Sequence, residues 1–230
     1  MKEATQIKPI LVVAIDGPAA SGKSTIAKKL AERLHVTYIN SGLMYRAITY
    51  KCLEKGLALP RDLSAIISLT ASTAFHVGPT KMLIDGVDLS LHASELRVSR
   101  AVSLYSQQTA IRRILIKRQR EIAQTQSVVM DGRDIGTVVF PRATYKFYLD
   151  ASNEVRAKRR LTELQEQFPA QSFSFKEILS DQQIRDQSDR DRKVSPLKTA
   201  HDAIVIDTSS LTIDEAVEKL LSLINNPSEG

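Results

Sequence analysis

Four short runs of apolar residues in the chain each end in an aspartate. They are ILVVAID, SVVMD, TYKFYLD and AIVID, and their last residues are Asp16, Asp131, Asp150 and Asp207. Runs that are apolar on both faces suit buried parallel strands, and segments of helical period lie between them. The pattern predicts an α/β fold with a parallel core sheet. Ligands of such sheets bind at the edge where the carboxyl ends of the strands meet, so we expect a site there.

Two long segments interrupt the strand pattern. The first, about 41–126, holds a predicted helix at 42–55, short strands in FHV, MLIDG and VDLSL with a turn at GPT, and two helical segments, the second being QQTAIRRILIKRQREIAQ. An insertion of this length is too long for a simple crossover and indicates a subdomain with a small extra β-sheet. We expect a single domain, 1–230, whose core segments are about 8–40, 127–151 and 194–226.

The second interruption, about 152–193, has a middle of loop composition, LQEQFPAQSFSF, between charged helices, as a mobile flap or lid requires. Its last part, IRDQSDRDRK, carries two charged stripes at helical spacing. The stripes are Arg185, Asp189 and Arg192, and Asp186, Arg190 and Lys193. We expect the first stripe to face a ligand. The second suits a solvated surface on which Asp186 and Arg190 pair at i, i+4.

Composition narrows the class of partner without choosing it. The chain has 230 residues, of which 43% are hydrophobic and 25% charged, so a globular fold with a full core is expected. Its net charge of +6 implies an anionic partner, and nucleic acid, anionic lipid and phosphorylated metabolites all fit. Cys52 is the single cysteine, so no internal disulfide can form, which fits a reducing, cytoplasmic setting.

A phosphate-binding motif follows the first predicted strand and opens a helix. It matches G-x-x-x-x-G-K-[ST], in which glycines let successive backbone N–H groups point at phosphate oxygens beside a helix N-terminus. Lys23 would reach the β- and γ-phosphates of a nucleoside triphosphate, and the Ser24 hydroxyl would hold Mg²⁺. The predicted cofactor-binding residues are Gly17, Pro18, Ala19, Ala20, Ser21, Gly22, Lys23, Ser24 and Thr25.

Several activities use such a loop. A GTPase would want an N-K-x-D loop to read its base, and this tetrapeptide does not occur in the chain. A small kinase needs only an acceptor site and an arginine-rich flap, which the second interruption offers. An RNA-binding module is the alternative from another class, because RRILIKRQR and RAKRR are basic. Only 5% of the residues are aromatic and there is no Trp, so the stacking platform of single-strand binders is missing.

Three further motifs together resemble the bacterial-type cytidylate kinase family. They are SGLMYR at 41–46, DGRDIGTVVFP at 131–141, and the R-x-x-x-D-x-x-R spacing of the first stripe, and the likeness runs from about residue 10 to 224. The resemblance implies a P-loop NTPase fold of three α/β/α layers, with an inserted monophosphate-binding subdomain and a helical lid. It also implies ATP with Mg²⁺ as donor and CMP and dCMP as acceptors. Adenylate, UMP/CMP and shikimate kinases remain the alternatives among kinases.

The resemblance also implies roles for individual residues. Ser41, Ser103, Arg112 and Asp134 would contact the cytosine side of the acceptor, Arg46, Arg133 and Arg185 its phosphate, and Asp189 and Arg192 its sugar. Lys23, Arg133, Arg160 and Arg185 would be the catalytic residues, with Arg156, Arg159 and Arg160 as lid candidates for clamping the transferring phosphoryl group. The implied protein is a cytoplasmic monomer with neither a nucleic-acid nor a membrane partner.

The chemistry of these side chains is sensible apart from the resemblance. Cytosine presents an amine that donates and a ring nitrogen that accepts, which suits a carboxylate such as Asp134 beside a donor such as Arg112. The chain departs from the family pattern at Asn40, where Asp or Thr-type residues are usual, and at Thr109, where the family often has proline.

Overall fold

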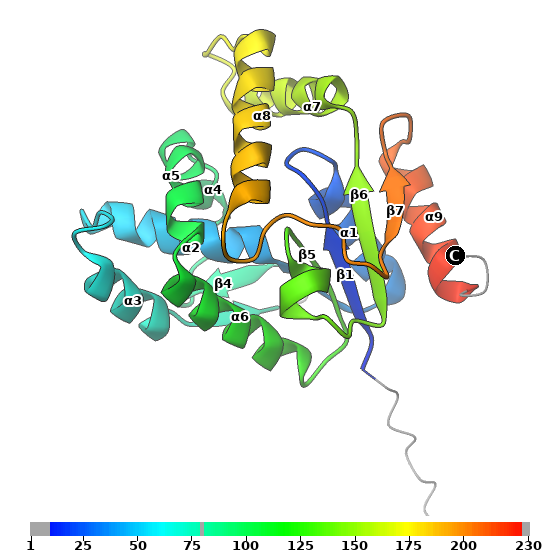
Figure 1. The fold of residues 1–230 in the computed structure, drawn as a ribbon, viewed down its shortest axis with the longest axis horizontal. Helices are drawn as coiled ribbons and strands as arrows, with labels where there is room; N and C mark the ends of the chain where they lie inside the picture. The colour runs from blue at the N-terminus through cyan, green and yellow to red at the C-terminus, as the bar shows by residue number, and fades with distance from the viewer. Residues whose placement is uncertain (1–9, 79–80, 227–230) are drawn as a thin grey trace, which may run out of the picture.

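The computed structural model describes residues 10–78 and 81–226. A five-stranded sheet forms its centre, and every pairing in it is parallel. Its strand order is β2 (Thr37–Asn40), β5 (Val128–Gly132), β1 (Val12–Asp16), β6 (Tyr145–Asp150) and β7 (Ile204–Asp207). The predicted parallel core sheet is confirmed, and all four apolar runs are strands. Figure 1 shows the carboxyl ends of β6 and β7 pointing toward the top of the view.

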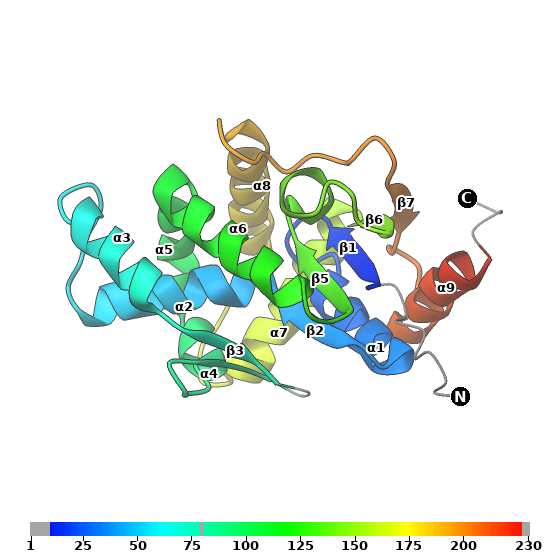
Figure 2. The ribbon, with the colours of Figure 1, turned by 90° about the horizontal axis from the view of Figure 1, so that it is seen from below.

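Both faces of the sheet are covered, because alternate residues of each strand face opposite sides. Val13 and Ile15 of β1 belong to the core cluster packed against α1 (Lys23–Leu34) and α9 (Ile213–Asn225). Ala14, the residue between them, belongs to the cluster that includes α2 (Ser41–Glu54) and α6 (Thr109–Ala123). Figure 2 shows α1 and α9 on one side of the sheet and α2 and α6 on the other.

The segment between β2 and β5 builds the first insertion. It contains α2, α3 (Leu63–Ser72), β3 (Phe75–Val77), β4 (Met82–Ile84), α4 (Ser90–Ala93), α5 (Leu96–Ser106) and α6. β3 and β4 pair antiparallel, which confirms a small extra sheet. Asn40 begins this segment as the N-cap of α2, since its side-chain oxygen accepts from the N–H of Leu43 at 2.8 Å. Thr109 is the first residue of α6, so the helix starts there without a proline.

The last part of the chain holds two helices that form a hairpin. A short π-helical turn (Ile135–Val139) follows β5, and α7 (Asn153–Gln167) and α8 (Phe175–Asp191) lie between β6 and β7. Figure 1 shows α7 above the carboxyl end of β6 and α8 upright beside the strand ends. The loop that joins them, 168–174, is shorter than the stretch predicted from loop composition, because α7 continues to Gln167.

The sequence predictions of secondary structure were wrong or incomplete in several places, and α3 was not predicted at all. VDLSL is not a strand: Val87 makes an isolated bridge with Ile84, and α4 begins at Ser90. β2 was not predicted, because its sequence, TYIN, is short and half polar and it lies at the sheet edge. The predicted GPT turn falls partly outside the described residues, as do the first two residues, 8 and 9, of the predicted core. Within the described ranges, no helix has the length and apolarity to cross a membrane.

Candidate active site

The phosphate loop connects β1 to α1 and has the backbone that its sequence predicts. Gly17 and Gly22 have φ values of 151° and 84°, which side chains rarely tolerate. A Cβ added to Gly17 would lie 2.1 Å from the carbonyl oxygen of Leu149, so only glycine fits there. No side chain of the described residues caps α1, whose first N–H groups are left for a ligand. The loop therefore offers the anion site that the motif predicts.

Two polar groups of the loop match a phosphate ligand. The hydroxyl of Ser21 is buried and has no hydrogen-bond partner among the described residues. Lys23 is 6% exposed, and its ammonium donates to the carbonyl oxygen of Pro18 at 2.8 Å. Burial, reinforced by the nearby charges of Arg133 and Arg185, lowers the pKa of Lys23 well below its usual value. A bound phosphate would stabilise the charged form of Lys23, so the loop fits a polyphosphate.

A carboxylate lies beside the predicted metal ligand. The hydroxyl of Ser24 donates to Oδ2 of Asp131 at 2.6 Å, and the hydroxyl of Tyr38 donates to Oδ1 at 2.8 Å. Among the described residues, no group of three or more His, Cys, Asp or Glu side chains forms a metal site by itself. Ser24 and Asp131 suit Mg²⁺ that is held mainly by nucleotide phosphates and water. The site residues predicted from sequence omitted Asp131, although its position at a strand end was the available signal.

The other strand-end aspartates do not face the phosphate loop in the same way. Asp16 turns to the π-helical turn, where it accepts from the N–H groups of Ile135 and Gly136 at 2.8 and 2.7 Å. Asp150 accepts from the N–H of Ala151, and Asp207 from that of Ser209. Three of the four strand-end aspartates thus accept hydrogen bonds from backbone N–H groups. Asp131 alone of the four bonds to a side chain of the phosphate loop.

Arg112 and Asp134 form a buried ion pair between α6 and the segment after β5. Arg112 also donates to the carbonyl oxygen of Ser106 at 3.1 Å and lies 5.2 Å from the ring centroid of Tyr45. Its Nε is buried without a hydrogen-bond partner in the described part of the chain. Ser103 lies one turn before Ser106 on α5 and accepts from the Gln107 side chain rather than from this pair. The pair is therefore in place to read a polar ring.

Ser41, the first residue of α2, lies against the end of β5. Its hydroxyl donates to the carbonyl oxygen of Asp131 at 2.7 Å, and a Cβ on Gly132 would lie 2.6 Å from that hydroxyl. The start of α2 is therefore packed directly against the end of β5, where the DGRD segment begins. Four residues were predicted to contact the base. Arg112 and Asp134 contact each other, whereas Ser41 bonds to the end of β5 and Ser103 lies on α5.

Four arginines converge between the phosphate loop and this ion pair. We call Arg46, Arg133, Arg160 and Arg185 the arginine cluster. Burial, together with the charges of Arg133, Arg46 and Arg160, lowers the pKa of Arg185 to about 10, and Asp189 opposes this fall. Burial likewise lowers the pKa of Arg46. The charges of Arg133 and Arg160 add to the fall in the pKa of both Arg46 and Arg185, so the cluster is short of negative charge and suits an anion.

Asp189 organises one side of the arginine cluster. Its Oδ2 accepts from Nε of Arg133 at 2.9 Å, and its Oδ1 lies 3.7 Å from Nη1 of Arg192. Burial alone would raise the pKa of Asp189, but Arg133, Arg192 and Arg185 hold it below its usual value. Nη2 of Arg192 is buried without a hydrogen-bond partner among the described residues. Arg185, Asp189 and Arg192 therefore lie together on the side of α8 turned toward Arg133, and that this side binds a ligand stays a prediction.

The prediction for the second stripe was wrong for Asp186 and its pairing, although Arg190 and Lys193 are exposed as expected. Asp186 is 2% exposed, and its Oδ2 lies 2.5 Å from Nη1 of Arg156, not beside Arg190. Arg156 comes from α7, so the pairing depends on a contact between two helices that helical spacing within one of them cannot reveal. Arg156 is itself 2% exposed, and all three of its guanidinium nitrogens bond to protein acceptors.

The three candidate lid arginines have three different surroundings. Arg156 is buried behind the phosphate loop, where its donors are already used. Arg159 donates to the hydroxyl and carbonyl oxygens of Thr208 at 3.1 and 2.6 Å. Arg160 pairs with Glu163 at 2.8 Å and belongs to the arginine cluster. Of the three, Arg160 is the one that lies with the other cations of the arginine cluster.

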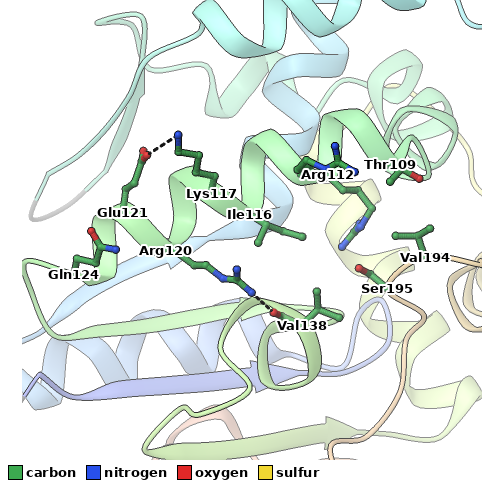
Figure 3. Close-up of a pocket in the computed structure, with 11 residues that line it drawn as sticks. Thr109, Arg112, Ile116, Lys117, Arg120, Glu121, Gln124, Val138, Val194 and Ser195 are labelled. Atoms are coloured by element: carbon green, nitrogen blue, oxygen red, sulfur yellow. Dashed lines mark hydrogen bonds and ion pairs between the residues drawn. The ribbon is translucent and has the colours of Figure 1, made fainter.

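A cavity lies along one side of α6 and is lined in part by Arg112 (Figure 3). Its volume is about 590 Å³, and its lining includes Arg112, Ile116 and Arg120 from α6 and Val194 and Ser195 from the segment after α8. Arg120 is held there by the carbonyl oxygens of the π-helical turn. Neither the phosphate loop nor the arginine cluster contributes to the lining of the cavity.

The phosphate loop can bind one anion, and the nearby arginine cluster can bind a second. This arrangement suits an enzyme that moves a phosphoryl group between two anionic substrates. The parallel sheet and its phosphate loop place the protein in the class of P-loop kinases. The shikimate kinase of Bacteroides thetaiotaomicron has a related fold, with a TM-score of 0.51 over 94% of this chain and 99% of that chain at 13% identity. At this identity, the likeness is one of fold alone.

Sequence comparison gives the family. The family model for cytidylate kinase matches residues 13–226. A cytidylate kinase of Clostridium tetani (strain Massachusetts / E88) is 45% identical over 216 residues, which are 94% of each chain. One of Caldanaerobacter subterraneus subsp. tengcongensis is 44% identical over 218 residues, 95% of this chain and 96% of that one. The chain belongs to the cytidylate kinase family, whose members are nucleoside monophosphate kinases.

Proposed function

We propose that the protein transfers the γ-phosphoryl group of ATP to CMP and dCMP, giving CDP and dCDP, by in-line displacement with Mg²⁺. The observation that carries the proposal is the arginine cluster, which lies between the phosphate loop and the Arg112–Asp134 pair. No covalent intermediate is needed, so the work of the protein is to position two anions and to offset charge in the transition state.

On the donor side, the phosphate loop would bind ATP. The residues assigned to it are Gly17, Pro18, Ala19, Ala20, Ser21, Gly22, Lys23, Ser24 and Thr25. Lys23 would leave the carbonyl of Pro18 for the β- and γ-phosphates, and Ser24 with Asp131 would hold Mg²⁺, directly or through water. The metal would neutralise charge that develops on the phosphoryl oxygens.

On the acceptor side, the arginine cluster would hold the phosphate of CMP. Arg46, Arg133 and Arg185 can offer planar, paired N–H groups to a dianion. Arg160, from the α7–α8 hairpin, would bridge to the transferring group. Lys23, Arg133, Arg160 and Arg185 are thus the residues we assign to catalysis, and the hairpin is the lid that excludes water.

The base would be read by the buried Arg112–Asp134 pair, with Ser41 and Ser103 beside it. The carboxylate of Asp134 would accept from the cytosine amine, and a donor of Arg112 would face the ring nitrogen. Uracil would present an acceptor to that carboxylate and leave buried polar groups unpaired. Asp189 and Arg192 would contact the sugar. We further expect the protein to act as a monomer in the cytoplasm, with neither nucleic acid nor membrane as partner.

Phosphoryl transfer by the pure protein tests this proposal. ADP release is measured with ATP–Mg²⁺ and each of CMP, dCMP, UMP, AMP, GMP and shikimate. We expect CMP and dCMP to have the highest kcat/KM, by roughly 100-fold over UMP. Lys23→Ala should abolish turnover with every acceptor, which shows that the phosphate loop does the work. Preference for AMP, UMP or shikimate would instead support one of the other kinases.

A further inference from the structure

Several side chains bind the carbonyl oxygens of the phosphate loop, on the side away from its N–H groups. Lys23 donates to the carbonyl oxygen of Pro18 at 2.8 Å and Arg156 to the carbonyl oxygen of Ala19 at 3.0 Å. The hydroxyl of Thr208 lies 3.0 Å from the carbonyl oxygen of Ser21. In a loop whose N–H groups converge on an anion, the carbonyl groups must be satisfied on the other side. Lys23 has a second task with the triphosphate, so Arg156 and Thr208 are the anchors that remain when ATP binds.

Arg156 does not act alone, because it shares Ala19 with Asp186. Nη1 of Arg156 lies 2.5 Å from Oδ2 of Asp186, and the N–H of Ala19 makes a long contact of 3.4 Å to Oδ1. The ion pair thus reaches both the N–H and the C=O of one residue in the phosphate loop. The side chains of Arg156 and Asp186 are only 2% and 3% exposed, so water does not compete for these bonds.

The next residue explains why the loop needs an anchor at this point. Ala20 has a φ of 57°, a left-handed conformation that residues with a side chain adopt only when their surroundings hold them there. The backbone on its amino-terminal side is fixed by the Arg156–Asp186 pair, and the carbonyl of Ser21 on its other side is fixed by Thr208. The strained residue therefore lies between two anchored neighbours.

The pair also joins the two halves of the site. Arg156 belongs to α7 and Asp186 to α8, and the amide of Gln182 in α8 donates to the carbonyl of Arg156 at 3.2 Å. Arg185, the residue before Asp186, lies in the arginine cluster. One turn of α8 therefore presents a cation toward the acceptor side and a carboxylate toward the phosphate loop. The position of the loop is thereby tied to the position of the hairpin.

We propose that Arg156 and Asp186 are positioning residues for the donor nucleotide: from the α7–α8 hairpin they fix Ala19, so that the N–H groups of the phosphate loop meet the triphosphate in a preformed geometry. Neither residue touches a substrate in this role. The inference rests on the proposed use of ATP and adds to it the device that holds the donor site in shape. It predicts that substitutions of the pair weaken ATP binding and lower the transfer rate, while CMP binding stays nearly unchanged.

The test replaces the pair by apolar residues of similar size, Arg156→Met with Asp186→Leu. A buried ion pair can often be replaced in this way without loss of the fold, whereas removing one partner leaves a buried charge. Binding of a non-hydrolysable ATP analogue and of CMP alone is measured by calorimetry, and kcat by ADP release. We expect the analogue to bind about tenfold more weakly and kcat to fall about 100-fold, while the affinity for CMP changes less than about twofold.

The matched control removes exposed charges from the same two helices, Lys158→Met with Arg190→Leu. This variant should bind both nucleotides and turn over like the wild type. Unchanged analogue affinity and kcat in the Arg156→Met/Asp186→Leu variant would overturn the proposal. An equal loss of analogue and CMP affinity would overturn it too, because the pair would then merely support α8.

A milder variant covers the case in which the double replacement does not fold. Asp186→Asn keeps an acceptor for Arg156 at nearly the same volume, and it should again weaken the ATP analogue more than CMP. Equal weakening of the two ligands by Asp186→Asn, or none, contradicts the proposal. If the wild type binds the analogue but does not phosphorylate CMP, the proposed function fails, while the comparison of analogue affinities still tests the role of the pair.

Discussion

Arg133 and Asp189, 56 residues apart in the chain, meet in a hydrogen bond of 2.9 Å between Nε and Oδ2. Arg133 follows β5, and Asp189 lies near the end of α8, so the bond links the sheet edge to the α7–α8 hairpin. Among the residues that the structure describes, Nη2 of Arg133 makes no bond to Asp189, and Arg185 has no carboxylate at ion-pair distance. This arrangement of one carboxylate among several cations leaves positive charge for an anionic ligand.

Arg185→Ala should weaken the acceptor complex and slow transfer. Arg185 is one of the three arginines proposed to hold the phosphate of CMP, and it carries a pKa lowered to about 10 by burial and its cationic neighbours. We expect kcat/KM for CMP to fall roughly 100- to 1000-fold. Arg185→Lys should recover only part of this, because an ammonium lacks the planar fork. Steady-state kinetics with CMP as the varied substrate measure the effect.

Arg190→Ala is the control for this prediction. Arg190 lies on the same helix, and its side chain is exposed, so the variant should keep the kinetics of the wild type. If Arg185→Ala retained full activity with CMP, α8 would not face the acceptor phosphate.

Asp134→Asn should erode the preference for cytosine. The amide of Asn can donate to the carbonyl of uracil as well as accept from the cytosine amine, so the ratio of kcat/KM for CMP over UMP should fall by about tenfold or more. Asp134→Ala would have a second effect, because it leaves Arg112 buried without its partner at a cost of about 3–5 kcal/mol in stability. The ratio is measured with both acceptors under one set of conditions.

Asp207→Asn is the matched control for Asp134→Asn, since it changes another strand-end aspartate that is exposed and bonds only locally. Its CMP-to-UMP ratio should equal that of the wild type. An Asp134→Asn variant with an unaltered ratio would show that the base is read elsewhere.

The stability of the protein should depend on pH through Asp16. Burial raises the pKa of Asp16 from 3.8 to about 7, with Asp134 adding to the rise and Lys23 opposing it. Because the folded pKa is the higher one, this stabilisation is fully present below the unfolded pKa and is lost as the pH rises through about 7. The free energy of unfolding, relative to that of Asp16→Asn, should therefore fall by about 4 kcal/mol between about pH 4 and 7.

Urea unfolding of both proteins across this range measures the difference. Comparison with Asp16→Asn at each pH removes the contributions of the other titrating groups, including Asp134 and Lys23. A difference that stays constant from pH 4.5 to 8 would contradict the assignment of the raised pKa to Asp16.

Mg²⁺ dependence should change with Asp131. The carboxylate of Asp131 bonds to the Ser24 hydroxyl, so Asp131→Asn should raise the Mg²⁺ concentration for half-maximal activity by roughly 10- to 100-fold. Tyr38→Phe removes the other hydrogen bond to this carboxylate and should have a smaller effect. Activity titrated with Mg²⁺ at fixed ATP, after removal of metal with EDTA, measures both. An unchanged titration for Asp131→Asn would place the metal elsewhere.

Local patterns in the sequence were enough to predict the core strands and the phosphate loop. The apolar runs that end at Asp16 and Asp131 are buried on both faces, and the glycines of the loop are fixed by backbone geometry that no other residue fits. β2 escaped prediction because its short TYIN sequence is held by its neighbour β5 and not by its own pattern. A strand that is stabilised mainly by its partner strand shows little strand pattern in its own sequence.

The same limit explains the error over Asp186. The i, i+4 spacing to Arg190 indicated a surface pair, but the fold brings Arg156 of α7 to Asp186 across the hairpin. The spacing of Arg185, Asp189 and Arg192 did predict a shared face, because that relation lies within one helix. The roles of these side chains toward a substrate came from family resemblance, and they stay predictions.

A crystal structure of the protein with CMP tests the central claim most directly. We predict that the phosphate of CMP lies within hydrogen-bond distance of the guanidinium groups of Arg46, Arg133 and Arg185, with the base against Arg112 and Asp134. A CMP phosphate bound away from these three arginines would contradict the account.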